Sequence, residues 1–319
     1  MLDLVPDDYV APLAGIQRFR LDPASLPESR VQMVAMFETL FPEKGDYAVV
    51  DAKGGDGGTV TVRLFEPPIR PRAPVPALLY LHSGGFVLGS AAMMDGYCAH
   101  LARELGVVVA NVDYRLAPEA AFPGPIEDCL AALEWLHAEA EVLGIDAGRI
   151  GVMGDSGGGG LAAALCLLAR DRGGLPVKAQ LLLYPMLDCR TGAEPAQNPS
   201  VGEFTWSREM NAIGWAAMRG DAPIDPTRIG HFSPSLATDL SRLPDTWIGV
   251  GSIDLFVDEC LDYAMRLMRA RVRVDLRTYG GGFHGFDRLP GRLSSEFEQD
   301  LFVAIRRLLD SSPAAAPPG

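Results

Sequence analysis

The chain lacks the segments that place a protein in a membrane or send it out of the cell. Its 319 residues contain no uncharged apolar run of about 18 residues, the length that a membrane-spanning helix needs. The first residues, Met1 to Asp8, have neither the basic region nor the apolar stretch of a signal peptide. We therefore expect a cytoplasmic protein with no membrane partner.

Cysteine is scarce as well. The five cysteines are an odd number and show no metal-ligand spacing. Cys129, Cys166 and Cys260 fall in helical patterns where a small apolar side chain is sufficient. We predict reduced cysteines with a structural role.

Basic residues are outnumbered by acidic ones. The chain has 28 Lys and Arg against 41 Asp and Glu, which gives a formal net charge of −13. Such a charge repels nucleic acid and anionic membranes, so no nucleic-acid partner is expected. The remaining composition, 48% hydrophobic and 22% charged, is typical of a soluble globular protein that can bury one large core.

Eight strand-like runs organise the chain. From the third onward they alternate with helical segments such as Asp128 to Leu143 and Leu161 to Arg170, a pattern that predicts a largely parallel sheet with helices on both faces. The first two runs are separated by the glycine-rich residues 54–58 and predict an antiparallel hairpin at one edge. The runs are Tyr47 to Ala52, Thr59 to Phe65, Val75 to Leu81, Val107 to Asp113, Arg149 to Met153, Lys178 to Tyr184, Thr246 to Gly251 and Val272 to Tyr279.

The most informative segment surrounds Ser156. A strand pattern ends at Met153, and a helical run begins at Leu161. Between them, Gly154-x-Ser156-x-Gly158 matches the nucleophile elbow, a strained strand-to-helix turn that lifts a serine Oγ above the sheet. The four successive glycines that follow indicate close backbone packing, since each costs roughly 0.5–1 kcal/mol against alanine in a helix. We predict that Ser156 is a nucleophile.

Three alternatives exist for this glycine-rich segment. One is a turn with an incidental serine. Another is a phosphate-binding loop, which the absence of a following Gly-Lys-Ser/Thr disfavours. The third is a dinucleotide fingerprint, but Gly158-x-Gly160-x-x-Ala163 begins inside the helix rather than at the end of the strand.

A nucleophilic serine needs a base, and two histidines follow Ser156 in the chain. His284 comes just after the strand-like run Val272 to Tyr279, in a loop at the carboxyl end of a strand, where ligands bind in open parallel sheets. His231 precedes every good acid candidate and suits a loop or a pocket wall. His284 is therefore the predicted base.

The acid that orients the base is expected after the buried strand that ends at Gly251. Asp254 is the first carboxylate beyond that end, so it can stand at the same sheet edge as the serine and the histidine. Asp258 and Glu259 come one helical turn later and suit the first turn of the next helix, whose dipole favours them.

Donors for an oxyanion are expected after the apolar strand that begins at Val75. Gly84 and Gly85 follow that strand, and a glycine pair lets two backbone N–H groups point at one spot. The N–H group of Gly157 would complete the oxyanion hole.

Six motifs in this order resemble the hormone-sensitive-lipase-like family of α/β-hydrolases, the bacterial family IV esterases. The resemblance covers roughly residues 45–310. The motifs are His82-x-Gly84-Gly85, Asp113-Tyr114-Arg115-Leu116-Ala117-Pro118-Glu119, Phe122-Pro123 with Asp128, Gly154-Asp155-Ser156-x-Gly158-Gly159, Asp254-x-x-x-Asp258-Glu259 and His284-Gly285-Phe286.

The resemblance implies a role for each matching position. Ser156 would be the nucleophile, His284 the base and Asp254 its orienting acid, with Gly84, Gly85 and Gly157 as the oxyanion hole. His82 and Arg115 would brace the oxyanion loop. Ser83 and Gly157 depart from the residues common in the family, glycine and alanine, without removing a backbone donor.

The resemblance also implies an α/β-hydrolase fold with a helical cap. Residues 1–45 and 188–241 would form the cap, residues 46–187 and 242–310 the catalytic core, and the Pro/Ala-rich residues 311–319 a disordered tail. Five cap residues would line the acyl pocket or merely pack the cap: Phe204, Trp206, Met210, Trp215 and Met218.

Together these features predict a serine carboxylesterase. It would hydrolyse short- to medium-chain esters of small molecules through an acyl-enzyme intermediate, with no cofactor. An amidase or deacetylase on the same triad is the main alternative, and a non-catalytic receptor on this fold is another. Residues 272–279 have the pattern of an edge strand, which could pair with a second copy in a homodimer or be protected from pairing by its alternating charges.

Overall fold

The protein is built around one eight-stranded sheet. The computed structural model describes residues 2–16, 21–40, 45–53, 58–192 and 198–310. The strand order is β1-β2-β4-β3-β5-β6-β7-β8. The strands are β1 (Ala48–Lys53), β2 (Thr59–Phe65), β3 (Val75–Leu81), β4 (Val108–Asp113), β5 (Ile145–Asp155), β6 (Ala179–Leu183), β7 (Asp245–Gly251) and β8 (Val274–Tyr279).

The sheet is mostly parallel, as the sequence predicts. β1 pairs with β2, and β2 with β4, in antiparallel register, while every pair from β4 to β8 is parallel. The hairpin of β1 and β2 lies at one edge and β8 at the other. β5 starts at Ile145, four residues before the strand expected from Arg149.

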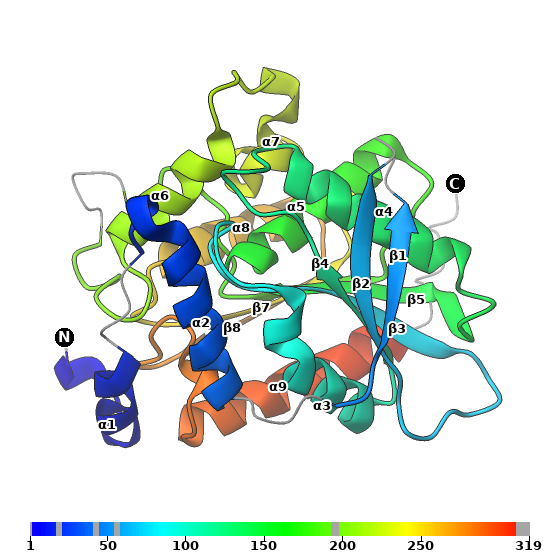
Figure 1. The fold of residues 1–319 in the computed structure, drawn as a ribbon, viewed down its shortest axis with the longest axis horizontal. Coiled ribbons are helices and arrows are strands. Elements are labelled where there is room, and N and C mark those ends of the chain that lie inside the picture. The colour runs from blue at the N-terminus through cyan, green and yellow to red at the C-terminus, as the bar shows by residue number, and fades with distance from the viewer. Residues whose placement is uncertain (1, 17–20, 41–44, 54–57, 193–197, 311–319) are drawn as a thin grey trace.

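Helices cover both faces of this sheet. In Figure 1, α3 and α9 lie on one face, while α4, α5 and α8 lie on the other. The helix expected over Asp128 to Leu143 begins earlier, at Gly124, because Pro125 suits the first turn of a helix. It also ends earlier, at Ala138. The helices are α1 (Asp7–Ile16), α2 (Leu26–Leu40), α3 (Asp95–Leu105), α4 (Gly124–Ala138), α5 (Gly157–Arg172), α6 (Arg208–Arg219), α7 (Ile229–Phe232), α8 (Val257–Arg269) and α9 (Arg292–Asp310).

The core follows from the strand sequences. β3, β4 and β6 are nearly continuous apolar runs, which is typical of parallel strands covered by helices on both faces. All residues of β6 are buried, whereas β1 at the edge is largely exposed. The cysteines are free, and Cys98, Cys129, Cys166 and Cys260 are buried within this core.

In the described residues, the segments assigned to a cap contribute four α-helices, namely α1, α2, α6 and α7. α1, α2 and α6 lie in the same half of the molecule, away from the β1–β2 hairpin (Figure 1). α1 is fixed to the start of α9, where the Tyr9 hydroxyl accepts a hydrogen bond from the Ser294 N–H (2.8 Å). The last part of the chain, residues 311–319, lies outside the described residues, so the predicted disordered tail is not tested.

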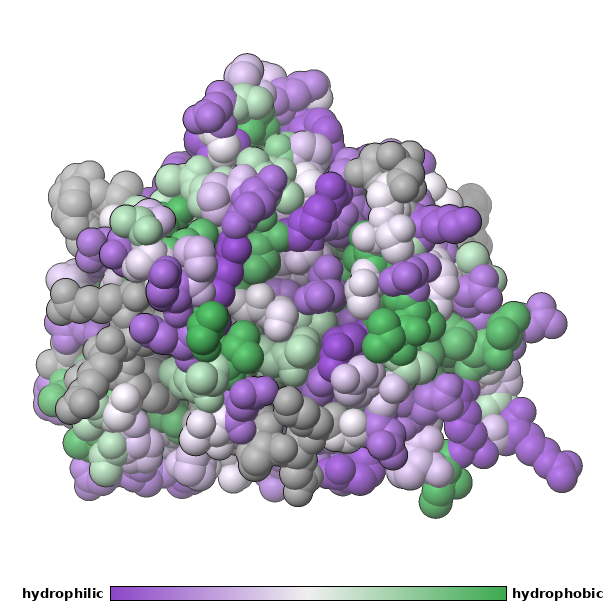
Figure 2. Space-filling view, in the orientation of Figure 1, coloured by the Kyte–Doolittle hydropathy of each residue, from purple (hydrophilic) through white to green (hydrophobic). Residues whose placement is uncertain are grey.

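The surface of the molecule is largely polar on the face that Figure 2 draws. Apolar side chains there form separate patches, and the exposed ones in the chain include Val31 of α2 and Val49 of β1. Among the described residues, no helix is both long enough and apolar enough to cross a membrane.

Candidate active site

Ser156 stands in a sharp turn between β5 and α5. Its φ of 55° and ψ of −119° are strained for a residue with a side chain. A Cβ on Gly154 would lie 2.3 Å from the Gly158 carbonyl oxygen, and a Cβ on Gly158 would lie 2.1 Å from the Leu81 carbonyl oxygen. Only glycine fits at these two positions, so the predicted elbow is present.

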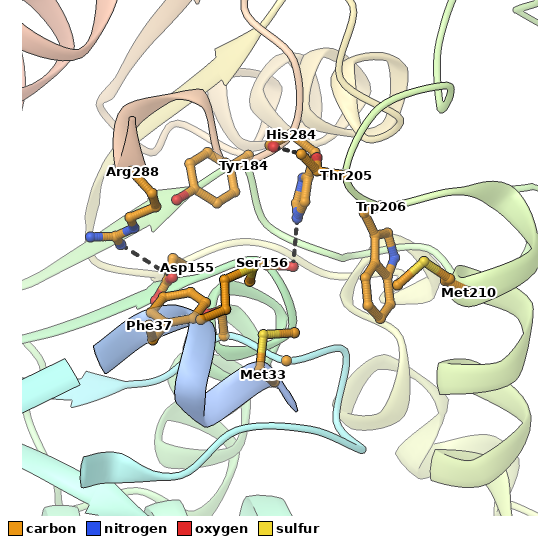
Figure 3. A pocket seen from close by; sticks show the side chains of 14 residues that line it. Met33, Phe37, Asp155, Ser156, Tyr184, Thr205, Trp206, Met210, His284 and Arg288 are labelled. Atoms are coloured by element: carbon orange, nitrogen blue, oxygen red, sulfur yellow. Dashed lines mark hydrogen bonds and ion pairs between the residues drawn. The ribbon is translucent and has the colours of Figure 1, made fainter. Parts of the chain in front are cut away.

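The structure brings Ser156, His284 and Asp254 into one hydrogen-bonded line (Figure 3). His284 Nε2 lies 2.9 Å from Ser156 Oγ, and His284 Nδ1 lies 2.9 Å from Asp254 Oδ2. Because an ionised carboxylate only accepts, Nδ1 carries the proton and Nε2 is left to accept from the serine hydroxyl. All three side chains are buried, which strengthens their electrostatic interaction.

Sheet topology explains this convergence. Ser156 follows β5, Asp254 follows β7, and His284 follows β8, so all three lie beyond the carboxyl ends of parallel strands. His231, the other histidine after the serine, lies in α7 and contacts Asp171 through Nε2 at 2.8 Å. It therefore lies in a short helix rather than in a loop, and its side chain is only 11% exposed.

Asp258 and Glu259 both lie in the first turn of α8, as expected. Asp258 is exposed and accepts a hydrogen bond from Asn198 (3.3 Å). Glu259 is buried, and burial raises its pKa well above the ordinary value. It accepts hydrogen bonds from the Leu187 N–H (2.6 Å) and the Thr191 hydroxyl, so it anchors the chain that enters the predicted cap, a role that the sequence did not show.

The glycine turn after β3 faces the start of α5. Gly84 and Gly85 have φ values of 130° and 57°, which favour glycine. The backbone N atoms of Gly85 and Phe86 lie 3.0 Å from the position that a Gly157 Cβ would occupy. The three glycines assigned to an oxyanion hole are thus brought together beside Ser156, and the lack of a side chain at position 157 keeps this approach open.

His82 and Arg115 support this turn in different ways. The His82 ring stacks on Tyr114 with centroids 4.2 Å apart, and burial lowers its pKa. Arg115 donates to the Asp128 carboxylate at 2.6 Å and so fixes its own segment. In the same segment, the Ala117 N–H donates to the Phe86 carbonyl (2.9 Å), directly after the glycine turn. Both contacts fit the bracing role that the resemblance implies.

Comparison with known proteins decides the family. A family model described as the α/β-hydrolase fold matches residues 78–288. The chain belongs to this family. The predicted α/β-hydrolase fold is therefore confirmed.

Similar proteins carry esterase names. Esterase LipI of Mycobacterium tuberculosis is 36% identical over 290 residues, which cover 84% of each chain. Ethyl acetate hydrolase of Pseudomonas putida is 36% identical over 262 residues, 79% of each chain. Among solved structures, a bacterial heroin esterase has a TM-score of 0.89 at 38% identity and covers 97% of this chain and 99% of its own.

A cavity of about 100 Å³ opens beside Ser156 and His284. Of the cap residues expected near an acyl pocket, Trp206 and Met210 line it, while Phe204, Trp215 and Met218 are buried and do not line it. Helix α2, in the segment 1–45 assigned to the cap, supplies a further apolar wall whose residues the sequence alone did not single out. Its lining residues are Met33, Met36 and Phe37. Figure 3 labels Met33 and Phe37 on this helix.

Arg30 holds α2 in this position. Its guanidinium donates to both Glu119 carboxylate oxygens (2.7 and 2.8 Å) and, through Nε, to the Val87 carbonyl (2.8 Å). Hydrogen bonding to Arg30 lowers the pKa of Glu119 to about 2. The cavity wall is thereby tied to the segment that follows the glycine turn.

A buried polar cluster lies next to the elbow. Asp155 accepts from the Tyr80 hydroxyl (2.6 Å) and from Arg288 (3.2 Å), an ion pair that Figure 3 shows. Asp287 accepts from the Tyr184 hydroxyl (2.8 Å), and burial raises the pKa of Asp287. The cluster links the nucleophile turn to the segment after His284. Apart from Asp155, its members carry no pattern that the sequence could show.

This geometry predicts selective chemical reactivity. We expect a fluorophosphonate probe to label Ser156 and no other serine, because His284 Nε2 is placed to accept the proton of this hydroxyl. Intact-mass and peptide mass spectrometry would measure the labelling, with Ser156→Ala as the unlabelled control. A label on another serine, or continued labelling of the alanine variant, would refute the assignment.

Proposed function

We propose that this protein is a serine carboxylesterase that hydrolyses short- to medium-chain acyl esters of small molecules. The observation that carries the proposal is the alignment of Ser156, His284 and Asp254 at 2.9 Å beside the glycine turn. The chain is also 36% identical to proteins named esterase and ethyl acetate hydrolase over most of their length. The six motifs place it with the hormone-sensitive-lipase-like esterases of the family.

The reaction follows from the geometry. Ser156 Oγ attacks the ester carbonyl carbon while its proton moves to His284 Nε2, and Asp254 stabilises the imidazolium that forms. The N–H groups of Gly84, Gly85 and Gly157 stabilise the negative charge on the carbonyl oxygen. His284 then donates its proton to the alcohol oxygen as the bond to the acyl carbon breaks. The acyl group stays bound to Ser156 Oγ as an acyl-enzyme.

Deacylation repeats these steps with water as the nucleophile. His284 takes a proton from the water molecule, which attacks the acyl carbon, and then returns a proton to Ser156 Oγ as the carboxylic acid leaves. Every atom comes from the ester and water, so the proposal requires no cofactor. An amidase on the same triad would need the same groups, and hydrolysis of amides instead of esters would favour that alternative.

A buried acid is proposed to hold the base in the productive orientation. We expect Asp254→Asn to lower kcat for ester hydrolysis by about 10⁴-fold, the effect of the matching change in serine proteases, because an amide does not stabilise the imidazolium. Asp258→Asn is the matched control and should leave kcat near the wild-type value, since Asp258 is exposed and contacts Asn198. Steady-state kinetics of both variants would reverse the assignment if Asp258→Asn were the impaired one.

The cavity limits the acyl chain. At about 100 Å³ it is smaller than the cavity of about 150 Å³ that accommodates benzene in an engineered protein. Each buried CH₂ adds about 0.8 kcal/mol until the pocket is full, after which further carbons gain no burial there.

We therefore expect kcat/KM for p-nitrophenyl esters to peak at an acyl chain of roughly two to eight carbons and to fall for longer chains. The small cavity places the maximum at the short end of this range. A series from acetate to palmitate would measure this. A maximum at palmitate, with a jump in rate above the critical micelle concentration, would instead indicate a lipase.

The division into cap and core is part of the proposal. Residues 1–45 and 188–241 act as the cap, since α2 and the segment around Trp206 supply the apolar cavity wall. Residues 46–187 and 242–310 form the catalytic core. The cytoplasmic location and the absence of a nucleic-acid partner stay predictions.

A homodimer through residues 272–279 is also proposed. β8 is the last strand of the sheet, so one side of it is available for pairing with a second copy. Light scattering at micromolar concentration should give twice the chain mass of 34.2 kDa, and a monomer mass would contradict the proposal.

A further inference from the structure

Three successive residues of the proposed cap cross the active site. The Phe204 ring packs against the Phe283 ring, with centroids 6.1 Å apart. The Thr205 Oγ1 lies 2.5 Å from the His284 carbonyl oxygen. The Trp206 indole lies so close to the glycine turn that a Cβ on Gly85 would be 2.2 Å from it. This segment therefore contacts the histidine, its loop and the oxyanion turn together.

Thr205 has a backbone conformation that threonine seldom adopts. Its φ is 58°, in the left-handed region, where a β-branched side chain is an outlier. Asparagine or glycine would tolerate this conformation with less strain. Strain of this kind persists where the surrounding structure requires it, and it is concentrated at functional sites.

The hydroxyl of Thr205 meets the carbonyl of the histidine itself. Figure 3 shows Thr205 beside His284, with the hydrogen bond drawn between them. The Phe204 carbonyl oxygen is also within reach, at 2.7 Å, but the hydroxyl has one proton and the His284 oxygen is nearer. In the described part of the chain, Thr205 is the donor placed on this carbonyl.

The loop that carries His284 is rich in glycine. Four of the six residues 280–285 are glycine, which restricts the backbone less than any other residue. Asp254 fixes the imidazole at Nδ1, and the Ile253 N–H donates to the Gly282 carbonyl (3.1 Å). Thr205 adds a contact at the backbone of the histidine, from a different part of the chain.

We infer that Thr205 is a positioning residue for His284. Its hydroxyl donates to the His284 carbonyl and so fixes the imidazole at the distance from Ser156 Oγ that proton transfer needs. Thr205 does not touch the reacting atoms, and it acts through the histidine. The inference rests on the proposed esterase function, and it gives the cap a part in catalysis beyond enclosing the substrate.

Three variants isolate the hydroxyl. Thr205→Val keeps the shape and the β-branch but removes the donor, whereas Thr205→Ser keeps the donor. Thr246→Val is the control for loss of a buried threonine hydroxyl. The Thr246 hydroxyl donates to the Pro244 carbonyl (2.9 Å) and accepts from the Gln180 amide (2.8 Å), at the start of β7 and far from the site. Melting temperature is measured for each variant, and the concentration of active sites is determined by labelling of Ser156.

We expect Thr205→Val to lower kcat per labelled site by about 10- to 100-fold, since small displacements of a catalytic group have effects of this size. KM should change little, and Thr205→Ser should stay near wild type. The loss should be larger for ethyl acetate than for p-nitrophenyl acetate, because ethanol leaves only when His284 protonates it. Thr246→Val should lower the melting temperature without changing kcat per labelled site.

Two results would overturn the inference. One is a Thr205→Val enzyme whose kcat per labelled site equals that of the wild type. The other is a loss of kcat that is equal for the two esters and proportional to the fall in melting temperature. The rate of Ser156 labelling by the fluorophosphonate is a test that does not depend on the substrate. If the wild-type protein hydrolyses no ester, slower labelling of Thr205→Val than of Thr205→Ser still supports the inference, and equal labelling rates refute it.

Discussion

The structure depends on the close approach of the start of α5 to the ends of two strands. A Cβ on Gly158 would lie 2.1 Å from the Leu81 carbonyl oxygen at the end of β3, and one on Gly160 would lie 2.1 Å from the Met186 carbonyl oxygen after β6. No side chain fits in either place. Because the helix can begin this near the sheet, the residue before it, Ser156, is held in a strained turn above the strand ends. The same approach sets the Gly157 N–H beside the turn of Gly84 and Gly85.

A buried ion pair completes the packing around this turn, and each of its two charged side chains would be costly to bury alone. Asp155 and Arg288 are both almost fully buried, and their ion pair is compensated by the Tyr80 hydroxyl and by the Tyr97 ring, which lies 4.3 Å from the guanidinium carbon. These contacts join β3, β5 and α3 to the segment after His284. Relative movement of Ser156 and His284 would break several buried polar contacts at once, so the cluster opposes such movement.

The proposed cap contributes to the site from two directions. Helix α2 is attached through Arg30 to Glu119 and to the carbonyl of Val87, next to the glycine turn. The segment 204–206 is attached to the histidine loop through Thr205 and through the ring of Phe204. One piece thus closes the cavity beside the oxyanion turn, and the other closes it beside the base.

Local sequence determined the parts of this protein whose physical cause lies within a few residues. The apolar runs predicted all eight strands, and the hairpin was predicted from its glycine-rich turn, because strand burial and turn geometry are local properties. Glycine spacing and position after strand ends predicted Ser156, Asp254 and His284, which the structure aligns. In a parallel sheet the carboxyl ends of the strands share one edge, so chain order alone brings such residues together.

Tertiary structure decided what depends on residues distant in the chain. The sequence does not show that Met33, Met36 and Phe37 face a cavity, because that depends on where α2 packs. Glu259 resembles an ordinary first-turn carboxylate until Leu187 is seen to donate to it. Arg288 and Thr205 likewise match no motif. Arg288 contacts Asp155, 133 positions away, and Thr205 contacts His284, 79 positions away. No periodicity or spacing in the sequence indicates a pairing across such distances.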